Sequence, residues 1–121
     1  MPRPVHFEIS ANNPERAANF YRDVFGWDIT RADGTAEYWF IATGNESRGI
    51  DGGLMRREAW NRGTVNTIEV HSLDETLLAV SQGGGKIVDG KMAITGVGWL
   101  AYCEDSEGNR FGVMQPDPTA A

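Results

Sequence analysis

The sequence has one cysteine, no apolar run near the length of a membrane-spanning helix, and no surplus of basic charge. Cys103 alone cannot form an intramolecular disulfide, which fits a reducing compartment. The 121 residues include 17 acidic and 11 basic side chains. The resulting net charge of −6 disfavours nucleic acid as a partner. The first residues, MPRPVHFE, lack the apolar core of a signal peptide. These absences predict one soluble, cytoplasmic domain with no membrane or nucleic-acid partner.

The segment VHFEIS, residues 5–10, alternates between apolar and polar residues, which is typical of a half-buried strand. Its apolar residues are expected to lie under a helix, and its other face would carry His6, Glu8 and Ser10. A histidine beside a carboxylate on one strand face can be a pair of metal ligands, an acid–base pair or the polar wall of a cleft. The residues alone leave these alternatives open.

The same order of elements occurs twice along the chain. In the first half, Asn13 is expected to cap a helix that starts at Pro14 and stops at Gly26. Its half-buried face would carry Ala17, Ala18, Phe20, Tyr21, Val24 and Phe25. Three strands are then predicted over 27–31, 36–44 and 50–57. The second half repeats this order as a strand over 64–72, a helix over 72–85 with Ser72 as its N-cap, and strands over 86–90, 97–105 and 109–116.

A constant offset of 59 positions relates the two halves. It maps Ile9 onto Ile68, Gly26 onto Gly85, and Gly53-Leu54-Met55 onto Gly112-Val113-Met114. We therefore predict an α+β fold of tandem βαβββ modules within a single domain, with module one at about 1–59 and module two at about 60–121. The curved mixed sheets would form a half-barrel with the helices outside and a cleft on the concave side. The segment 56–63 is the expected linker.

Three features resemble the vicinal oxygen chelate superfamily, which includes glyoxalase I, extradiol dioxygenases and bleomycin-resistance proteins. They are His6 followed by NNPERAANFYRDVFGW, the paired modules, and the late YCEDSEGNRFGVMQ. The last segment is similar to the superfamily's D-P-x-G-N turn, with Ser106 where proline is usual. The resemblance implies the glyoxalase/bleomycin resistance fold, a small-molecule ligand and a homodimer.

The resemblance also implies four metal-ligand positions, and these fall at His6, Gly53, Val65 and Gly112. Of these residues only the histidine has a donor atom, whereas a catalytic metal usually needs three protein ligands. We therefore expect no metal and no other cofactor. An alternative set would join His6, Glu8 and Glu69 around one ion.

The two glycines are expected to leave room for a ligand in the cleft. The residues expected to line it are Trp39, Gly53, Met55, Thr67, Trp99, Gly112 and Met114, with His6, Glu8 and Glu69 as polar or catalytic groups. The favoured hypothesis is a metal-independent binder of a small, partly apolar molecule. The alternatives are a lyase, isomerase or dioxygenase-type enzyme with His6 as general base beside Glu8 or Glu69, or a partner-binding module with an exposed 60–62 loop.

Overall fold

The computed structural model describes residues 2–59, 61 and 63–121 and divides into two compact units. The first unit comprises residues 6–65, and the second comprises residues 66–121 with the described residues before His6. The predicted 60–62 loop contains two residues that lie outside the described part. The elements are β1 (Arg3–Ala11), α1 (Pro14–Phe25), β2 (Asp28–Arg31), β3 (Tyr38–Ala42), β4 (Asp51–Arg56), β5 (Thr64–Glu69), α2 (Leu73–Gln82), β6 (Lys86–Ile94), β7 (Gly98–Glu104) and β8 (Arg110–Pro116).

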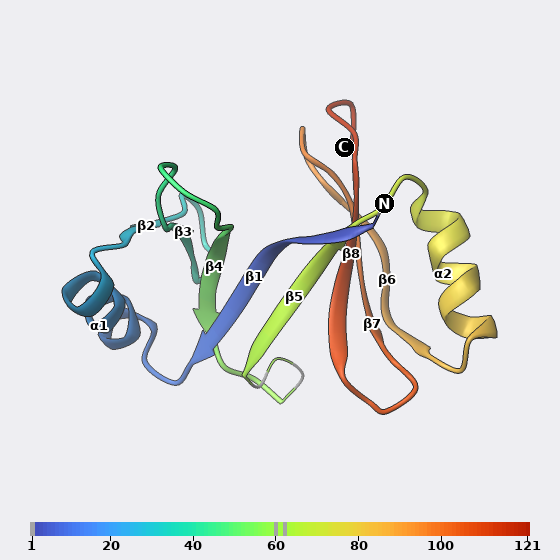
Figure 1. Ribbon diagram of the computed structural model, residues 1–121, viewed down its shortest axis with the longest axis horizontal. Helices are drawn as coiled ribbons and strands as arrows, with labels where there is room; N and C mark the ends of the chain where they lie inside the picture. Colours follow the sequence, from blue (N-terminus) through green and yellow to red (C-terminus); the bar gives the residue numbers. More distant parts are fainter. Residues whose placement is uncertain (1, 60, 62) are drawn as a thin grey trace. The chain divides into compact units, whose positions relative to one another are not determined.

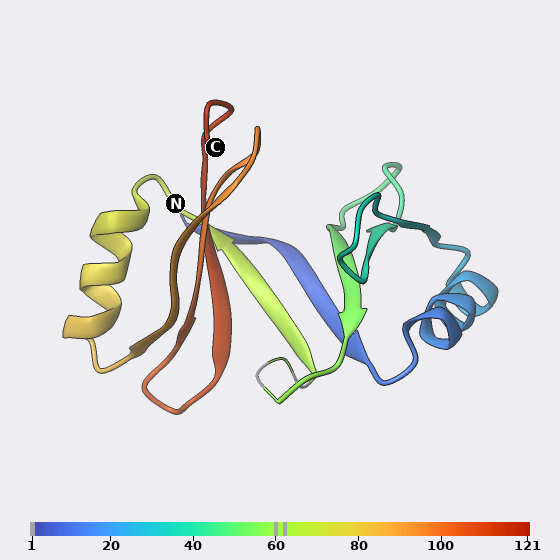
Figure 2. The same cartoon turned by 180° about the vertical axis from the view of Figure 1, so that it is seen from behind.

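The first unit is a four-stranded mixed sheet with α1 against one face (Figures 1 and 2). Its strand order is β2-β3-β4-β1, with β1 and β4 parallel and the other pairs antiparallel. The register places His6 opposite Asp51 and Glu8 opposite Gly53. Because side chains alternate along a strand, residues at these paired positions point to the same face of the sheet.

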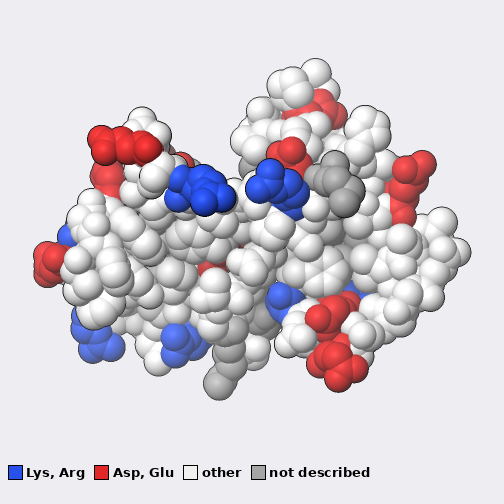
Figure 3. Space-filling view, in the orientation of Figure 1, with Lys and Arg blue, Asp and Glu red and all other residues white. Residues whose placement is uncertain are grey.

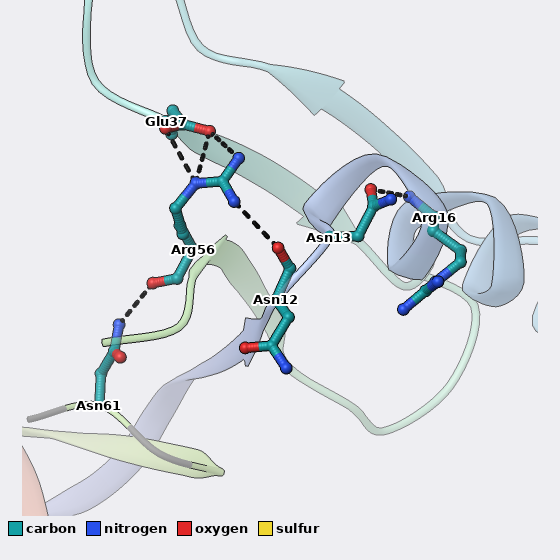
Figure 4. Close-up of polar contacts among 6 residues, drawn as sticks. All are labelled: Asn12, Asn13, Arg16, Glu37, Arg56 and Asn61. Atoms are coloured by element: carbon teal, nitrogen blue, oxygen red, sulfur yellow. Dashed lines mark hydrogen bonds and ion pairs between the residues drawn. The ribbon is translucent and has the colours of Figure 1, made fainter. Parts of the chain in front are cut away.

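Helix α1 begins and ends where the sequence predicts. The Asn13 side chain accepts a hydrogen bond from the Arg16 backbone amide at 3.1 Å (Figure 4), and Gly26 ends the helix in the left-handed conformation at φ 72°. The predicted helix face was partly wrong, because Phe20, Val24 and Phe25 are more than half exposed. Small residues, which allow close approach, contact the sheet instead: Pro14, Ala17 and Ala18, with Tyr21 beside them.

The core of the first unit lies between α1 and the sheet. Its buried members are Ala11, Ala18, Ile29, Trp39, Ile41 and Leu54. Phe7 and Ile9 pack against this core, as their alternation in β1 predicts, whereas Val5 is 39% exposed. Among the described residues of this unit, no helix lies over the opposite face of the sheet, and we call this face the open face.

The second unit repeats the arrangement with the strand order β5-β8-β7-β6 and α2 over one face. As predicted, Ser72 caps α2: its side chain accepts a hydrogen bond from the Glu75 backbone amide at 3.2 Å. The helix ends at Gly83 rather than at Gly85, the repeat partner of Gly26, and β6 extends four residues beyond its predicted end. The core under α2 contains Val70, Leu73, Ala101, Cys103 and Val113.

The described part of the predicted linker is bonded to the first unit (Figure 4). The Arg56 guanidinium donates to the Glu37 carboxylate, the shortest contact being 2.7 Å, and to the Asn12 carbonyl at 2.9 Å. Asn61 in turn donates to the Arg56 carbonyl at 3.1 Å. These bonds fix the start of the segment that follows β4. A role of this segment in exchanging modules between copies stays a prediction.

The α+β fold of two βαβββ modules is confirmed. The half-barrel and the cleft shared by both modules stay predictions. None of the described helices has the length and apolar composition needed to cross a membrane. On the face drawn in Figure 3, lysine and arginine side chains are interspersed with acidic ones and do not merge into one basic surface.

Candidate functional site

The open face of the first unit brings together polar and apolar side chains from three strands. β1 contributes His6 and Glu8, β3 contributes Tyr38 and Phe40, and Met55 extends from β4 next to Tyr38. The alternation that places Phe7, Trp39 and Leu54 under α1 sends these neighbours to the opposite side. The sequence pattern that builds the core therefore also builds the candidate site.

The hydroxyl group of Tyr38 lies between His6 and Glu8. It is 3.1 Å from His6 Nε2 and donates to Glu8 Oε2 at 3.1 Å, whereas His6 Nε2 and Glu8 Oε2 are 4.0 Å apart. The Glu8 residue is 8% exposed, so its carboxylate needs such partners within the protein. We call these three residues the His6–Tyr38–Glu8 network.

The network also fills the space beside Gly53. A Cβ atom at residue 53 would overlap the Tyr38 hydroxyl, so no side chain fits there while Tyr38 keeps its position. At Gly112 in the second unit, a Cβ would lie 2.8 Å from Thr67 Oγ1 and 3.4 Å from Tyr102. At Gly53 the expected room for a ligand is therefore filled by Tyr38, whereas room for a ligand at Gly112 stays a prediction.

His6 is held in its neutral form. Burial lowers the pKa of its imidazole below the ordinary value of 6.5, and the carboxylates of Glu8 and Asp51 offset only part of this effect. With the Tyr38 hydroxyl donating to Glu8, we assign the imidazole proton to Nε2, from which the Tyr38 oxygen then accepts. Within the described residues no hydrogen bond reaches Nδ1, so this nitrogen can accept a proton or a hydrogen bond from a ligand.

A hollow of about 350 Å³ lies on the open face beside the network. We call it the His6 hollow, and its lining includes His6, Asp28, Thr30, Phe40, Ala42 and Asp51. The Phe40 ring is 58% exposed and stands edge-on to Tyr38, with 5.5 Å between the ring centroids. An exposed aromatic ring next to a neutral histidine provides an apolar surface and a directed polar contact.

The two tryptophans expected in the ligand site lie elsewhere. Trp39 is 4% exposed and belongs to the core under α1, with the Arg31 guanidinium 5.0 Å from its ring centroid. Trp99 packs against the core under α2, and its indole nitrogen donates to Asp117 at 3.0 Å. Both positions alternate with open-face residues in their strands, so both rings point toward the helices. Placing Trp39 and Trp99 with the ligand-binding residues was a wrong face assignment.

The remaining predicted residues lie on the face of the second unit's sheet that is opposite α2. Thr67, Gly112 and Met114 are on the side opposite the core under α2, and Glu69 is exposed. Glu69 lines a further hollow of about 680 Å³ with Pro2, Val70, His71, Gln115 and Pro116. No phenylalanine, tyrosine or tryptophan is among these six. A set that joins Glu69 to His6 and Glu8 would involve both units and stays a prediction.

The residues present do not fit the four-ligand metal site that the resemblance implies. His6 Nε2 is bonded to Tyr38, and the Tyr38 hydroxyl takes the place of a side chain at residue 53. Val65 is buried and aliphatic. Among the residues that the structure describes, no group of three or more His, Cys, Asp and Glu side chains is placed to share an ion. The expectation of a metal-free protein stays a prediction.

Sequence reasoning missed the side chains that surround His6. Tyr38 and Phe40 flank Trp39, so recognising Trp39 as a core residue would have placed both on the open face. Asp28, Thr30 and Asp51 come from strands whose register the sequence does not reveal. The alternation in β3 is therefore the sequence signal that could have placed Tyr38 and Phe40 beside His6.

Comparisons with known proteins agree with this architecture. A curated Didymella fabae protein, described as a glyoxylase-like domain-containing protein, is 32% identical over 112 residues, covering 88% of each chain. Among solved structures, methylmalonyl-CoA epimerase from Mycobacterium tuberculosis matches with a TM-score of 0.70 at 15% identity, covering 95% of this chain and 88% of that one. The hypothetical protein BH1468 from Bacillus halodurans matches with a TM-score of 0.71 at 12% identity, covering 99% of this chain and 98% of that one.

A Streptomyces coelicolor methylmalonyl-CoA epimerase in complex with 2-nitronate-propionyl-CoA matches with a TM-score of 0.71 at 14% identity, covering 98% of this chain and 97% of that one. At these identities the solved structures support the fold alone. The model of one family covers residues 3–113. Together with the curated relative, this match shows that the chain belongs to the Glyoxalase/Bleomycin resistance protein/Dioxygenase superfamily.

Proposed function

We propose that this protein binds a small, partly apolar molecule in the His6 hollow without the help of a metal ion. The observation that carries the proposal is the position of Tyr38, whose hydroxyl bonds the histidine and fills the space where a further metal ligand would have to lie. The hollow, at about 350 Å³, is within the range of small-molecule sites. The ligand would rest against Phe40 and donate a hydrogen bond to His6.

The geometry supports a ligand smaller than the acyl-CoA named for one of the solved epimerase structures. Coenzyme A esters carry several phosphate charges, which basic side chains usually neutralise. The described lining of the His6 hollow includes the carboxylates of Asp28 and Asp51 and no lysine or arginine. We therefore propose no acyl-CoA chemistry for this hollow.

A second candidate is an enzyme in which His6 acts as general base. The lowered pKa of His6 keeps its imidazole neutral near pH 7, and the Tyr38–Glu8 pair fixes its orientation. A substrate in the hollow would then lose a proton to Nδ1, as in a lyase or isomerase. This candidate predicts turnover that disappears in His6→Gln, whereas the binding proposal requires no turnover.

The first test uses small neutral probes observed by NMR. Benzyl alcohol and cyclohexanol are expected to bind with dissociation constants of about 1 mM, typical of ligands with so few heavy atoms. Their binding should shift the amide signals of β2, β3 and β4 around the hollow. Phe40→Ala should weaken benzyl alcohol binding about fivefold, because the exposed ring supplies the apolar wall.

Phe20→Ala is the matched control for this experiment. Phe20 is 54% exposed, close to the 58% of Phe40, but it lies on α1 outside the hollow. This variant should bind benzyl alcohol as the unmodified protein does. Equal weakening in both variants, or shifts that spare the hollow, would count against the proposal.

The proposal also includes the setting in which the protein works. We propose that it is a cytoplasmic homodimer whose partner is a small molecule, as the composition and the resemblance suggest. Sedimentation of the purified chain at micromolar concentration would distinguish a dimer from a monomer.

A further inference from the structure

We infer that the His6 hollow selects organic cations: a primary ammonium group carried on a small apolar body. This inference rests on the proposed function, because it names the class of ligand for the same hollow. The inference is drawn from the charges and the aromatic surface around the hollow.

Carboxylates dominate the charge of the hollow. Asp28 and Asp51 line it, and Glu8 lies next to His6 in the network. No lysine or arginine belongs to the described lining. The nearby Arg31 contacts Trp39, which is on the helix side of the sheet, so its guanidinium is directed away from the open face. A bound cation therefore meets attractive charges there, and a bound anion meets repulsive ones.

Asp51 is held in a fixed position. Its Oδ1 accepts from the Thr43 backbone amide at 2.9 Å. The Thr43 hydroxyl, which donates to the Ile50 carbonyl at 2.8 Å, lies 3.3 Å from the same oxygen. The second carboxylate oxygen, Oδ2, makes no further hydrogen bond among the described residues. A carboxylate oriented in advance loses little freedom when it pairs with an ammonium group, which favours binding.

Phe40 gives the hollow a second attraction for cations. Its ring is 58% exposed, and Phe40 lies on β3, the strand between β2 with Asp28 and β4 with Asp51, two residues from Ala42, which is the register partner of Asp28. Cations are attracted to the face of an aromatic ring. The neutral His6 adds no opposing charge. A ligand with a charged nitrogen and an apolar body would thus use each part of the lining.

Three probes that share one body test the inference: benzylammonium, benzyl alcohol and benzoate. At low ionic strength and pH 7.5, benzylammonium should bind about fivefold to tenfold more tightly than benzyl alcohol, from the sum of a cation–π contact and two exposed ion pairs. Benzoate should bind more weakly than benzyl alcohol. Raising the salt concentration should reduce the preference for benzylammonium, because exposed charges are screened.

Two neutralised aspartates serve as variant and control. Asp28→Asn should weaken the binding of benzylammonium about threefold, since one exposed ion pair is removed. The affinity for benzyl alcohol should stay unchanged. Asp23→Asn removes the same charge from α1, outside the hollow, and should change neither affinity. The inference is overturned if benzyl alcohol binds as tightly as benzylammonium. It is also overturned if Asp28→Asn lowers the affinity for benzylammonium no more than Asp23→Asn does. Either result leaves the proposed function standing. Absence of binding by all three probes overturns both.

Discussion

A Gly53→Ala variant is expected to lose about 1–3 kcal/mol of its free energy of unfolding, the range for adding a group to a packed site. The new methyl group would occupy the position of the Tyr38 hydroxyl. Tyr38 would have to move away, which breaks its hydrogen bonds to His6 and Glu8. Urea unfolding measures the loss, and the NMR signals of His6 should shift with it.

The control for this variant is Gly90→Ala. Gly90 also lies in a strand, but a Cβ there would meet no atom within 4 Å. We expect a change within about 0.5 kcal/mol. In a Tyr38→Leu background, Gly53→Ala should become much less destabilising, because the overlapping group is gone. An equal loss in both backgrounds would show that Tyr38 does not fill the space beside Gly53.

Leu54→Ala is expected to have the largest effect on stability, about 2–5 kcal/mol, as for other fully buried leucines. Leu54 is 0% exposed in the core of the first unit. Its partner by the 59-residue offset, Val113, is likewise buried in the second unit, at 1% exposure. Truncating the leucine leaves a cavity under α1, which the surrounding strands cannot close completely. Urea unfolding followed by tryptophan fluorescence measures the change.

Leu78→Ala is the matched control for the leucine variant. Leu78 lies on α2 and is 60% exposed, so its truncation should change the free energy of unfolding by no more than about 0.5 kcal/mol. If Leu54→Ala proved as mild as Leu78→Ala, the assignment of Leu54 to the core would be wrong. The alternation that separates the core from the open face would then need revision.

Most of the fold could be predicted from the sequence because local signals agree with one another. Asn13, Pro14 and Gly26 mark the ends of α1, and the alternation in β1 separates Phe7 from His6. The repeated order of elements then specifies the modules. The helix face facing the sheet was less predictable, since close packing favours Ala18 over the larger Phe20, and periodicity alone does not rank the two.

The candidate site was predictable only in part. His6 and Glu8 follow from one strand, and the absence of ligands at Gly53 follows from the resemblance. The role of Tyr38 does not, because it depends on the pairing of β3 with β4. A glycine in a sequence shows that the position carries no side chain. The fold decides whether the volume beside it is empty or filled by a neighbouring group. For Trp39, a large aromatic residue suggested a ligand contact, whereas strand register placed it in the core.

His6 belongs to a hydrogen-bonded network with Tyr38, and we propose that it binds no metal ion. The most direct test is ¹H–¹⁵N NMR of the imidazole during titration with Zn²⁺, Ni²⁺ or Mn²⁺, with Tyr38→Phe as the reference for the lost hydrogen bond. We predict a neutral ring with its proton on Nε2 and no saturable change at His6 up to one equivalent of metal. Stoichiometric binding that removes the Nε2 proton of His6 would contradict the claim.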